Sequence, residues 1–588
     1  MVVLVVLAIL LTWLAMAAVC IGIGSLFLRL ATSQRPSVVE CFWSGLTAIA
    51  AILQLVHFVR PIDAVIAVLL CVLALPGLFL MFQRFNIPAF RRFEAILFCL
   101  AVTLIAFRSA APTEHYDTGL YGAQAIRWFT TYSLVPGLGN LLGQLGFNSS
   151  VFLCIAALTH GPWRDLAHHV FSGFLLAAFF ASMVPAAMRI VRGRNISSAR
   201  ACSENNSAAD WFLTFLFLPA AIWAATGKLS GANTDLPTTI VCLVAAFFLF
   251  RSFDLQTQES SPQNSHSSHS APLSFLIAMA LFSLAITFKL SSLVFALTGW
   301  VVSFLALCLS RAMSPSQRKR VALVGVLLSA AIIVSWICRG LVLTGYPFFP
   351  SPALGISADW TVPAANAQAQ ADFARSFARI PQIPLADTAG YHWLLPWFRE
   401  LIREREGFLI PFFFMLASAV FIAANARREN REKPPRWLWL LLPAFAGILF
   451  WLFEAPAIRF GEPALWIAAA TLGTFAALQV SDPPAKRRIF IFFLLLLTAW
   501  AAHPRLLWNS HFRPSINVRA VSPLIQPRVV PQRTFSGLTI YVPVETNQCW
   551  DAPLPCSPYF SDTLRLRRAN ELGSGFVSNG PVVEKRVR

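Results

Sequence analysis

Apolar segments follow one another along this chain, each separated from the next by a polar stretch. Segments of about 17 to 25 apolar residues can cross a bilayer as helices, and the pattern predicts about fourteen spans, several of them short. The first segment has neither a basic start nor a small-residue cleavage site, so we expect a retained helix rather than a signal peptide. The predicted spans are residues 2–28, 38–59, 62–82, 93–107, 151–190, 211–226, 236–250, 273–287, 291–310, 321–337, 408–424, 438–453, 464–480 and 489–501.

The composition agrees with an integral membrane protein. Of the 588 residues, 57% are hydrophobic and 12% are charged, whereas a soluble domain has about 25% charged residues. The formal net charge of +19 does not indicate nucleic-acid binding, because the basic residues cluster between apolar segments and no nucleic-acid-binding motif is present. We therefore predict an all-α polytopic membrane protein with no nucleic-acid partner.

The basic clusters also predict the orientation, since loops rich in Lys and Arg stay in the cytoplasm. With fourteen spans the clusters share one side: residues 84–92, 189–200, 311–320, 427–436 and 486–488. The stretch 261–270, rich in Ser and His, falls there too, and we interpret it as a disordered linker rather than a metal site. The extracytoplasmic side receives residues 114–150, 226–235, 339–406, 454–463 and the tail from 503.

Residues 114–150 form the most polar and glycine-rich loop of the first half of the chain. A membrane protein can place such a loop outside the hydrocarbon or along a cavity, but not in lipid. A helix is predicted from Asp117, because helical spacing puts four of its side chains on one face. These four are Asp117, Tyr121, Gln124 and Trp128, while Leu120, Ala123 and Ile126 would rest on the membrane surface.

Two roles are equally compatible with this spacing. Asp117 is either a general base, with its neighbours hydrogen-bonding to a substrate and an aromatic ring stacking on a sugar, or only the N-cap of the helix. Glu114 is the next candidate for the base, and His115 could assist. Asn148 is a candidate for substrate binding, although Asn148, Ser149 and Ser150 fit better as caps of the following helix.

Three further charged residues lie at the expected outer ends of spans. Asp235 either caps its helix or belongs to a site. Lys289 either meets a phosphate or extends to the interface. Arg459 carries a guanidinium group that matches phosphate oxygens. We assign all three to substrate binding.

Cysteine spacing separates one pair from the rest. Nine of the eleven cysteines are scattered singly, whereas Cys549 and Cys556 lie close together in the polar tail. We interpret them as a disulfide, with half of a zinc site as the alternative. Residues 535–545 alternate as a strand does, so a small C-terminal α/β or β domain is expected. The chain then divides into transmembrane helices (1–108), an external active-site loop (109–150), a transmembrane core with a long external loop at 339–406 (151–501) and an extracytoplasmic domain (502–588).

These features resemble the GT-C superfamily, the polytopic glycosyltransferases that use polyprenyl-phosphate-linked sugars. More narrowly, residues 117–128 and 135–150 are similar to a group of bacterial multi-spanning proteins, which also shows counterparts of residues 234–237, 287–292, 344–350, 455–461 and 549–559. That group carries a histidine where this chain has Gly122 and an arginine near Gln144, and four predicted spans precede the loop where the superfamily commonly has one.

The resemblance implies an enzyme of the bacterial inner membrane with its active-site loop and tail in the periplasm. It would transfer a sugar from a polyprenyl-phosphate donor to a glycan, lipid or protein acceptor, with membrane lipid around it. Asp117 would be the base, and Arg459 and Lys289 would stabilise the leaving phosphate. No metal or other cofactor is expected, although one is not excluded.

The same mechanism predicts the distance between Asp117 and the cations that bind the phosphate. Base and phosphate clamp would face each other across one sugar ring, so Asp117 should lie about 6–10 Å from Arg459 or Lys289. Two other classes stay open: a transporter or flippase of lipid-linked sugars, and a non-catalytic envelope assembly protein. A transporter commonly shows related halves, and the sequence shows no internal repeat.

Overall fold

The structure is a computed structural model of the full chain. It describes residues 2–31, 36–82, 91–113, 115–192, 208–225, 229–259, 271–310, 313–381, 390–425, 434–480 and 523–578.

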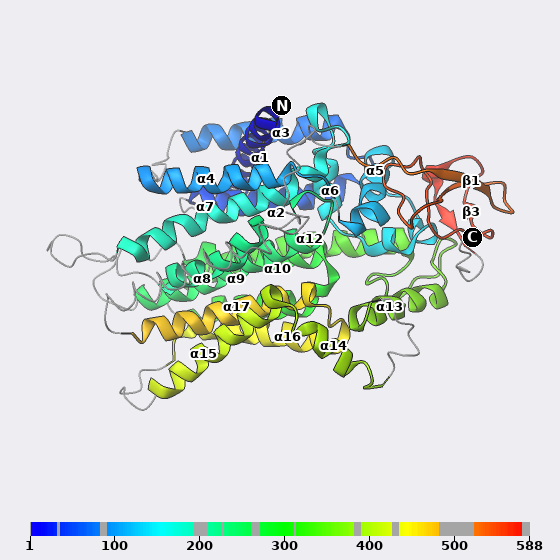
Figure 1. Ribbon diagram of the computed structural model, residues 1–588. Helices are drawn as coiled ribbons and strands as arrows, with labels where there is room; N and C mark the ends of the chain where they lie inside the picture. The colour runs from blue at the N-terminus through cyan, green and yellow to red at the C-terminus, as the bar shows by residue number, and fades with distance from the viewer. Residues whose placement is uncertain are drawn as a thin grey trace.

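A bundle of long helices makes up most of the molecule (Figure 1). Each predicted span from 2–28 to 464–480 coincides with a helix, and 489–501 lies outside the described residues. Eleven of the described helices are long and apolar enough to cross a membrane, which confirms a polytopic helical fold; the number fourteen stays a prediction. The long helices are α1 (Val2–Ala31), α2 (Val38–Val56), α3 (Ala64–Phe82), α4 (Arg92–Ser109), α7 (Phe171–Arg192), α8 (Ala208–Ala225), α9 (Asp235–Glu259), α10 (Ala271–Phe288), α11 (Leu293–Cys308), α12 (Pro315–Thr344), α15 (Ile410–Asn425), α16 (Leu441–Glu454) and α17 (Ile458–Leu478).

Helices α9 and α10 form the centre of the bundle. Their most apolar windows are 94% and 100% buried, against 17% for α1 and for the segment that contains α15. A helix that is apolar all round must be covered by protein or by lipid. The central pair is therefore covered by other helices, and the outer helices present leucine, valine and phenylalanine side chains to the bilayer.

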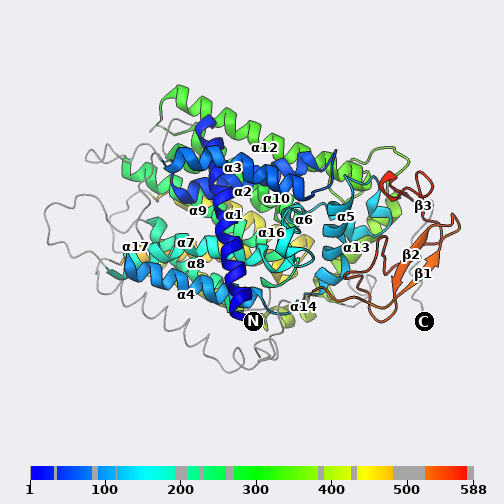
Figure 2. The same ribbon diagram turned by 90° about the horizontal axis from the view of Figure 1, so that it is seen from above.

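Short helices and the C-terminal strands gather at one end of the bundle (Figures 1 and 2). Leu120, Ala123 and Ile126 are buried in this end, so the prediction that they rest on the membrane surface is wrong; packed protein covers them instead. The other described helices, of which η10 packs instead against Phe250 toward the opposite end of α9, are η1 (Thr118–Gly122), α5 (Ala123–Thr131), η2 (Leu138–Asn140), η3 (Gly143–Phe147), α6 (Val151–Ala156), η4 (Gly161–Trp163), η5 (Ala167–His169), η7 (Leu290–Ser292), α13 (Ala364–Arg379), α14 (Leu394–Leu401), η9 (Arg405–Leu409), η10 (Arg436–Leu440) and η11 (Leu572–Ser574).

Helix α12 is longer than the hydropathy pattern predicts. We expected the span to end at residue 337 and an external loop to begin at Arg339, but the helix continues to Thr344. It ends where Gly345 adopts a left-handed conformation with φ of 85°, which glycine tolerates as a helix terminator. Arg339 therefore lies on a helix inside the bundle and not in a loop.

The C-terminal region is a small β structure. Strand β1 (Val529–Arg533) pairs antiparallel with β2 (Thr539–Pro543), and β3 (Arg565–Leu566) pairs with β4 (Phe576–Val577). Strand β2 lies within the predicted strand at 535–545, so that prediction is confirmed. In both ribbon views the strands lie beside α5, next to the loop that the sequence singles out.

Candidate active site

Five ionisable side chains from four separate segments meet at the strand-bearing end of the bundle. His115 and Asp117 precede η1, and Asp235 is the first residue of α9. Lys289 lies between α10 and η7, and Arg459 is the second residue of α17. The chain reaches this end of the bundle at each of these points, so side chains that are up to 342 positions apart come into contact (459 minus 117).

Arg459 lies between the two carboxylates. Its Nη1 is 3.5 Å from Oδ2 of Asp117 and 3.7 Å from Oδ2 of Asp235. Lys289 Nζ contacts Oδ1 of Asp235 directly. Two cations thus face two carboxylates in a part-buried space, where opposite charges attract more strongly than in water.

The predicted 6–10 Å separation between Asp117 and a phosphate-binding cation is therefore wrong. We expected a direct contact of this kind only if the pair were structural. The contact is nevertheless loose, because a charge-assisted hydrogen bond measures about 2.7–2.9 Å and both Arg459 contacts are longer. Arg459 is also the most exposed of the four charged groups, at 36% of its side chain.

Phe460 supports both cations. Lys289 Nζ lies 4.5 Å from the centre of the Phe460 ring, and the Arg459 guanidinium carbon lies 4.9 Å from it. An aromatic face within about 6 Å attracts a cation, so one ring holds both positive groups on the same side of the site. Sequence reasoning missed Phe460, although its position next to Arg459 was a signal.

A pocket opens beside these charges. It is small, with a cavity volume of about 20 Å³, and it is open to solvent on one side. Asp235, Lys289 and Arg459 line it, together with hydroxyl groups that the sequence analysis did not single out. The signal was present, because Asp235 and two threonines have the i, i+3, i+4 spacing of one helix face. These hydroxyl residues are Thr238, Thr239, Ser291 and Ser292.

Asp117 does not cap its helix with its side chain. It occupies the N-cap position of η1 but makes no side-chain capping bond, so its carboxylate is directed to the ionic cluster instead. It is 23% exposed, compared with 16% for Asp235. Of the two carboxylates, Asp117 is the more accessible and the less tightly paired. Glu114 lies outside the described residues.

His115 adjoins both carboxylates. Burial lowers the pKa of His115 below its usual 6.5, with Arg459 and Lys289 acting in the same direction, while Asp117 and Asp235 partly offset the shift. One donor atom each of His115, Asp117 and Asp235 lie within 4.8 Å of one another, a spacing that could hold a metal ion. Arg459 and Lys289 already neutralise these carboxylates, and a divalent cation would have to compete with them.

Trp128 and Tyr121 are both buried, and Tyr121 adjoins the site closely enough for the charges of Asp117, Asp235 and Arg459 to act on it. Tyr121 is 7% exposed, and its ring packs against Phe147 and Phe152 with centroid distances of 6.0 and 5.8 Å. Trp128 is 1% exposed and contacts Phe576, with ring centroids 5.7 Å apart. Neither ring is free to stack on a sugar, so the stacking role expected for the helix face does not hold.

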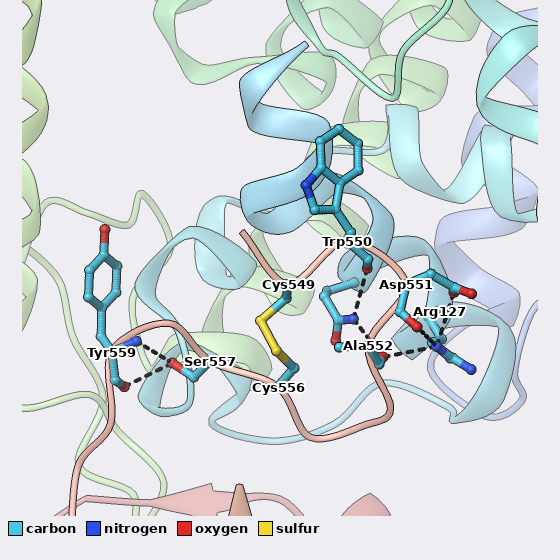
Figure 3. Close-up of a disulfide and its surroundings, with 9 residues drawn as sticks. Arg127, Cys549, Trp550, Asp551, Ala552, Cys556, Ser557 and Tyr559 are labelled. Carbon is cyan, nitrogen blue, oxygen red and sulfur yellow. Dashed lines mark hydrogen bonds and ion pairs between the residues drawn. A yellow bond between two sulfur atoms is a disulfide. The ribbon is translucent and has the colours of Figure 1, made fainter. Parts of the chain in front are cut away.

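Gln124 holds the C-terminal tail. Its Nε2 donates to the carbonyl oxygens of Trp550 and Ala552, each at 3.0 Å. Arg127 lies one helical turn away and donates from Nη1 to the Asp551 carbonyl oxygen at 2.8 Å (Figure 3). The Gln124 amide nitrogen is therefore occupied by protein contacts, its Oε1 has no partner among the described residues, and its role in substrate binding stays a prediction.

The tail loop also contacts η1 directly. Cys549 and Cys556 form a disulfide (Figure 3). The amide of Trp550 within this loop donates to the Gly119 carbonyl oxygen at 2.8 Å. A Cβ atom on Gly119 would lie 2.4 Å from the Trp550 ring, and one on Gly122 would lie 2.6 Å from the Ala232 carbonyl oxygen. Both glycines of η1 are thus required by close packing.

Asn148 lies away from the pocket. It adopts φ of 55° and its Nδ2 donates to the Trp336 carbonyl oxygen at 2.7 Å. Ser149 Oγ donates to the Phe288 carbonyl oxygen, and Ser150 Oγ bonds to Thr287 Oγ1. These residues tie the loop to α12 and α10, and the substrate role of Asn148 stays a prediction. Ser150 occupies the N-cap position of α6 without a side-chain cap bond, whereas Ser149 Oγ accepts from the Val151 amide at 3.3 Å.

The fold and the site define a class: a polytopic helical membrane protein with a charge-balanced pocket at one end of its bundle. The chain belongs to the family described as a domain of unknown function (DUF8201), whose model matches residues 6–466. Neither the curated proteins nor the solved structures give a match to it.

Proposed function

We propose that this protein is an integral membrane glycosyltransferase that moves a sugar from a polyprenyl-phosphate donor to an extracytoplasmic acceptor. The observation that carries the proposal is the position of Arg459, shared loosely between Asp117 and Asp235 beside Lys289 and the pocket. An anionic group that enters the pocket can take over the contacts of Arg459, and Asp117 is then released from a loose ion pair.

The cations suit a lipid phosphate. Arg459 presents a planar fork of donors and Lys289 a compact charge, and both cations lie within 5 Å of the centre of the Phe460 ring. Serine and threonine hydroxyl groups in the lining can donate to further phosphate oxygens. Together they would stabilise the negative charge that develops on the leaving phosphate.

The two carboxylates take different roles. Asp235 is held by Lys289 and serves to position that cation. Asp117 loses only a loose contact when a phosphate engages Arg459, and it then becomes free to accept a proton. In the reaction, the acceptor hydroxyl transfers its proton to Asp117 as its oxygen bonds to the anomeric carbon. The bond from that carbon to the phosphate oxygen breaks, and the polyprenyl phosphate leaves with the electron pair.

The membrane architecture supports a lipid-linked donor. The pocket lies at one end of a bundle whose outer helices expose apolar side chains, so a polyprenyl chain can remain in lipid while its phosphate enters the site. The proposal includes the orientation inferred from the basic clusters, with this end on the periplasmic side of the inner membrane.

The test is Asp117→Asn, which keeps the shape of the side chain but cannot accept a proton. We expect cells with this variant to accumulate unused polyprenyl-phosphate sugar, measured by mass spectrometry of lipid extracts. The purified variant should still bind a long-chain polyprenyl phosphate in nanodiscs. Asp359→Asn is the matched control, because Asp359 is a surface carboxylate paired with Arg567, and it should behave as wild type.

Each alternative gives a different result. If Asp117→Asn turns over donor at the wild-type rate, Asp117 is not the base and Glu114 becomes the next candidate. A flippase would instead show lipid-linked sugar retained on the cytoplasmic face. A non-catalytic assembly protein would leave the donor pool unchanged even when the gene is deleted.

A further inference from the structure

A second polar cluster lies inside the bundle, apart from the pocket residues. Its centre is Arg339 on α12, which is 0% exposed. Arg339 Nη1 donates to Asn148 Oδ1 at 2.7 Å, but its Nε and Nη2 have no hydrogen-bond partner among the described residues. Within the same part of the chain, no carboxylate pairs with this guanidinium group. A buried charge without a counter-ion is strongly unfavourable.

Helix α2 contributes more unpaired donors to the same neighbourhood. Gln54 is 0% exposed, and its Oε1 accepts from Ser335 Oγ at 3.4 Å. Ser335 lies one helical turn before Arg339, so both side chains project from the same face of α12. Gln54 Nε2 has no partner.

His57 completes the cluster at the end of α2. It is 1% exposed, one ring nitrogen faces the Tyr132 backbone, and neither nitrogen makes a hydrogen bond of good geometry among the described residues. The rings of His57 and Phe129 have centroids 4.7 Å apart, and the Arg339 guanidinium carbon lies 5.3 Å from the Phe129 ring. Both polar side chains therefore border the same aromatic residue.

We propose that Arg339, His57 and Gln54 form an internal binding site for a small monovalent anion of the chloride type. Apart from one nitrogen of a neutral imidazole, the unpaired atoms are donors, and the only charge among them is positive. An anion bound there would accept from Arg339 and Gln54 and would supply the missing counter-charge. The crowding by Phe129 favours a single-atom anion over a phosphate or a sugar acid.

The site would stabilise the loop that supports the pocket. Asn148 makes three hydrogen bonds with α12: its Oδ1 accepts from Arg339, its Nδ2 donates to the Trp336 carbonyl oxygen, and its own carbonyl oxygen accepts from the Trp336 indole at 2.8 Å. A bound anion that neutralises Arg339 would stabilise the buried position of its side chain. It would thereby stabilise the hydrogen bonds that hold Asn148 to α12. The inference rests on these contacts and not on the proposed transferase activity.

The test compares thermal unfolding of the purified full chain in sodium chloride and in sodium gluconate of equal ionic strength. We expect Tm to be a few degrees higher in chloride, with a shift that saturates as chloride rises, as for a ligand that binds only the folded state. Gln54→Leu should reduce the shift several-fold, and Arg339→Met should abolish it. Thr47→Val is the matched control, because Thr47 is a buried polar residue on the same helix whose hydroxyl bonds only within α2; its shift should equal that of wild type.

Two results would overturn the proposal. One is an equal Tm for the wild type in chloride and in gluconate, which would leave water as the partner of Arg339. The other is a chloride shift that persists in Arg339→Met. If that variant does not accumulate, wild-type crystals soaked in bromide decide the matter: anomalous density at Arg339 supports the site, and its absence there refutes it.

Discussion

The ionic cluster of the pocket and the cluster around Arg339 lie at the same end of the bundle, but they balance charge differently. In the pocket, Lys289 and Arg459 each contact a carboxylate and all four charged groups keep some exposure. Arg339 has no exposure and an amide as its hydrogen-bond partner. The pocket cluster is neutral by itself, so a phosphate can replace a carboxylate as the partner of Arg459, as the proposed reaction requires. The Arg339 cluster has donors around one cation, so it becomes neutral only when an anion binds.

The largest effect is expected from removing one partner in the pocket. Asp235→Ala leaves Lys289 part-buried without its carboxylate, which should lower the free energy of unfolding by about 3 kcal/mol. The double variant Asp235→Leu, Lys289→Met removes both charges and should recover most of this stability while losing polyprenyl phosphate binding. Thermal unfolding in detergent measures the first effect, and binding in nanodiscs the second. A single variant as stable as wild type would show that the pair does not balance the pocket.

A smaller effect is expected from giving the Arg339 cluster the carboxylate it lacks. Asn148→Asp keeps the shape of the side chain and tolerates the left-handed backbone, but it loses the bond to the Trp336 carbonyl oxygen, worth about 1 kcal/mol. The new charge should offset that loss and make Tm independent of chloride.

The control for this variant is Asn140→Asp. Asn140 is a buried amide in the same loop that donates to the Trp360 and Phe576 carbonyl oxygens, so its replacement should destabilise the protein yet leave the chloride shift intact. A chloride shift that survives in Asn148→Asp would contradict the anion site.

The smallest effect concerns pH. The pKa of His115 is lowered below 6.5 in the folded state, first by burial, and Asp117, Asp235, Arg459 and Lys289 are the charged groups that face it. As pH falls below 6.5 the unfolded chain binds a proton at His115 before the folded chain does, so stability falls with it. Tm measured from pH 7.5 down to pH 5 should therefore fall less in His115→Gln than in wild type. Parallel curves for the two proteins would show that His115 is not held neutral.

The sequence located the charged members of the pocket but not their contacts. Asp235, Lys289 and Arg459 stand at the ends of apolar spans, and that pattern alone marks them as exceptional. Their distances could not be predicted, because they depend on which helices are neighbours across more than 200 positions (459 minus 235). In the structure Arg459 contacts both carboxylates, so the space of one sugar ring that we expected between Arg459 and Asp117 is not present.

The surroundings of Gln124 and Trp128 could not be predicted for a related reason. Helical spacing shows which residues share a face but not what covers that face. Here the cover is the C-terminal tail, more than 400 positions later in the chain, which receives Gln124 at Trp550 and Trp128 at Phe576. Arg339 was placed in a loop because hydropathy falls at a charge, although the backbone has no reason to leave the helix before Gly345.

The contact between Trp550 and Gly119 can form only after the segment that carries Trp550 has been synthesised. Ribosomes make η1 early and the segment around Trp550 after all the described long helices. The carbonyl oxygen of Gly119 can meet the amide of Trp550 only after those helices have been synthesised. The residues beside Asp117 therefore reach their final surroundings late, and a chain truncated before the tail would carry every charged group of the pocket but not the contact that closes over η1.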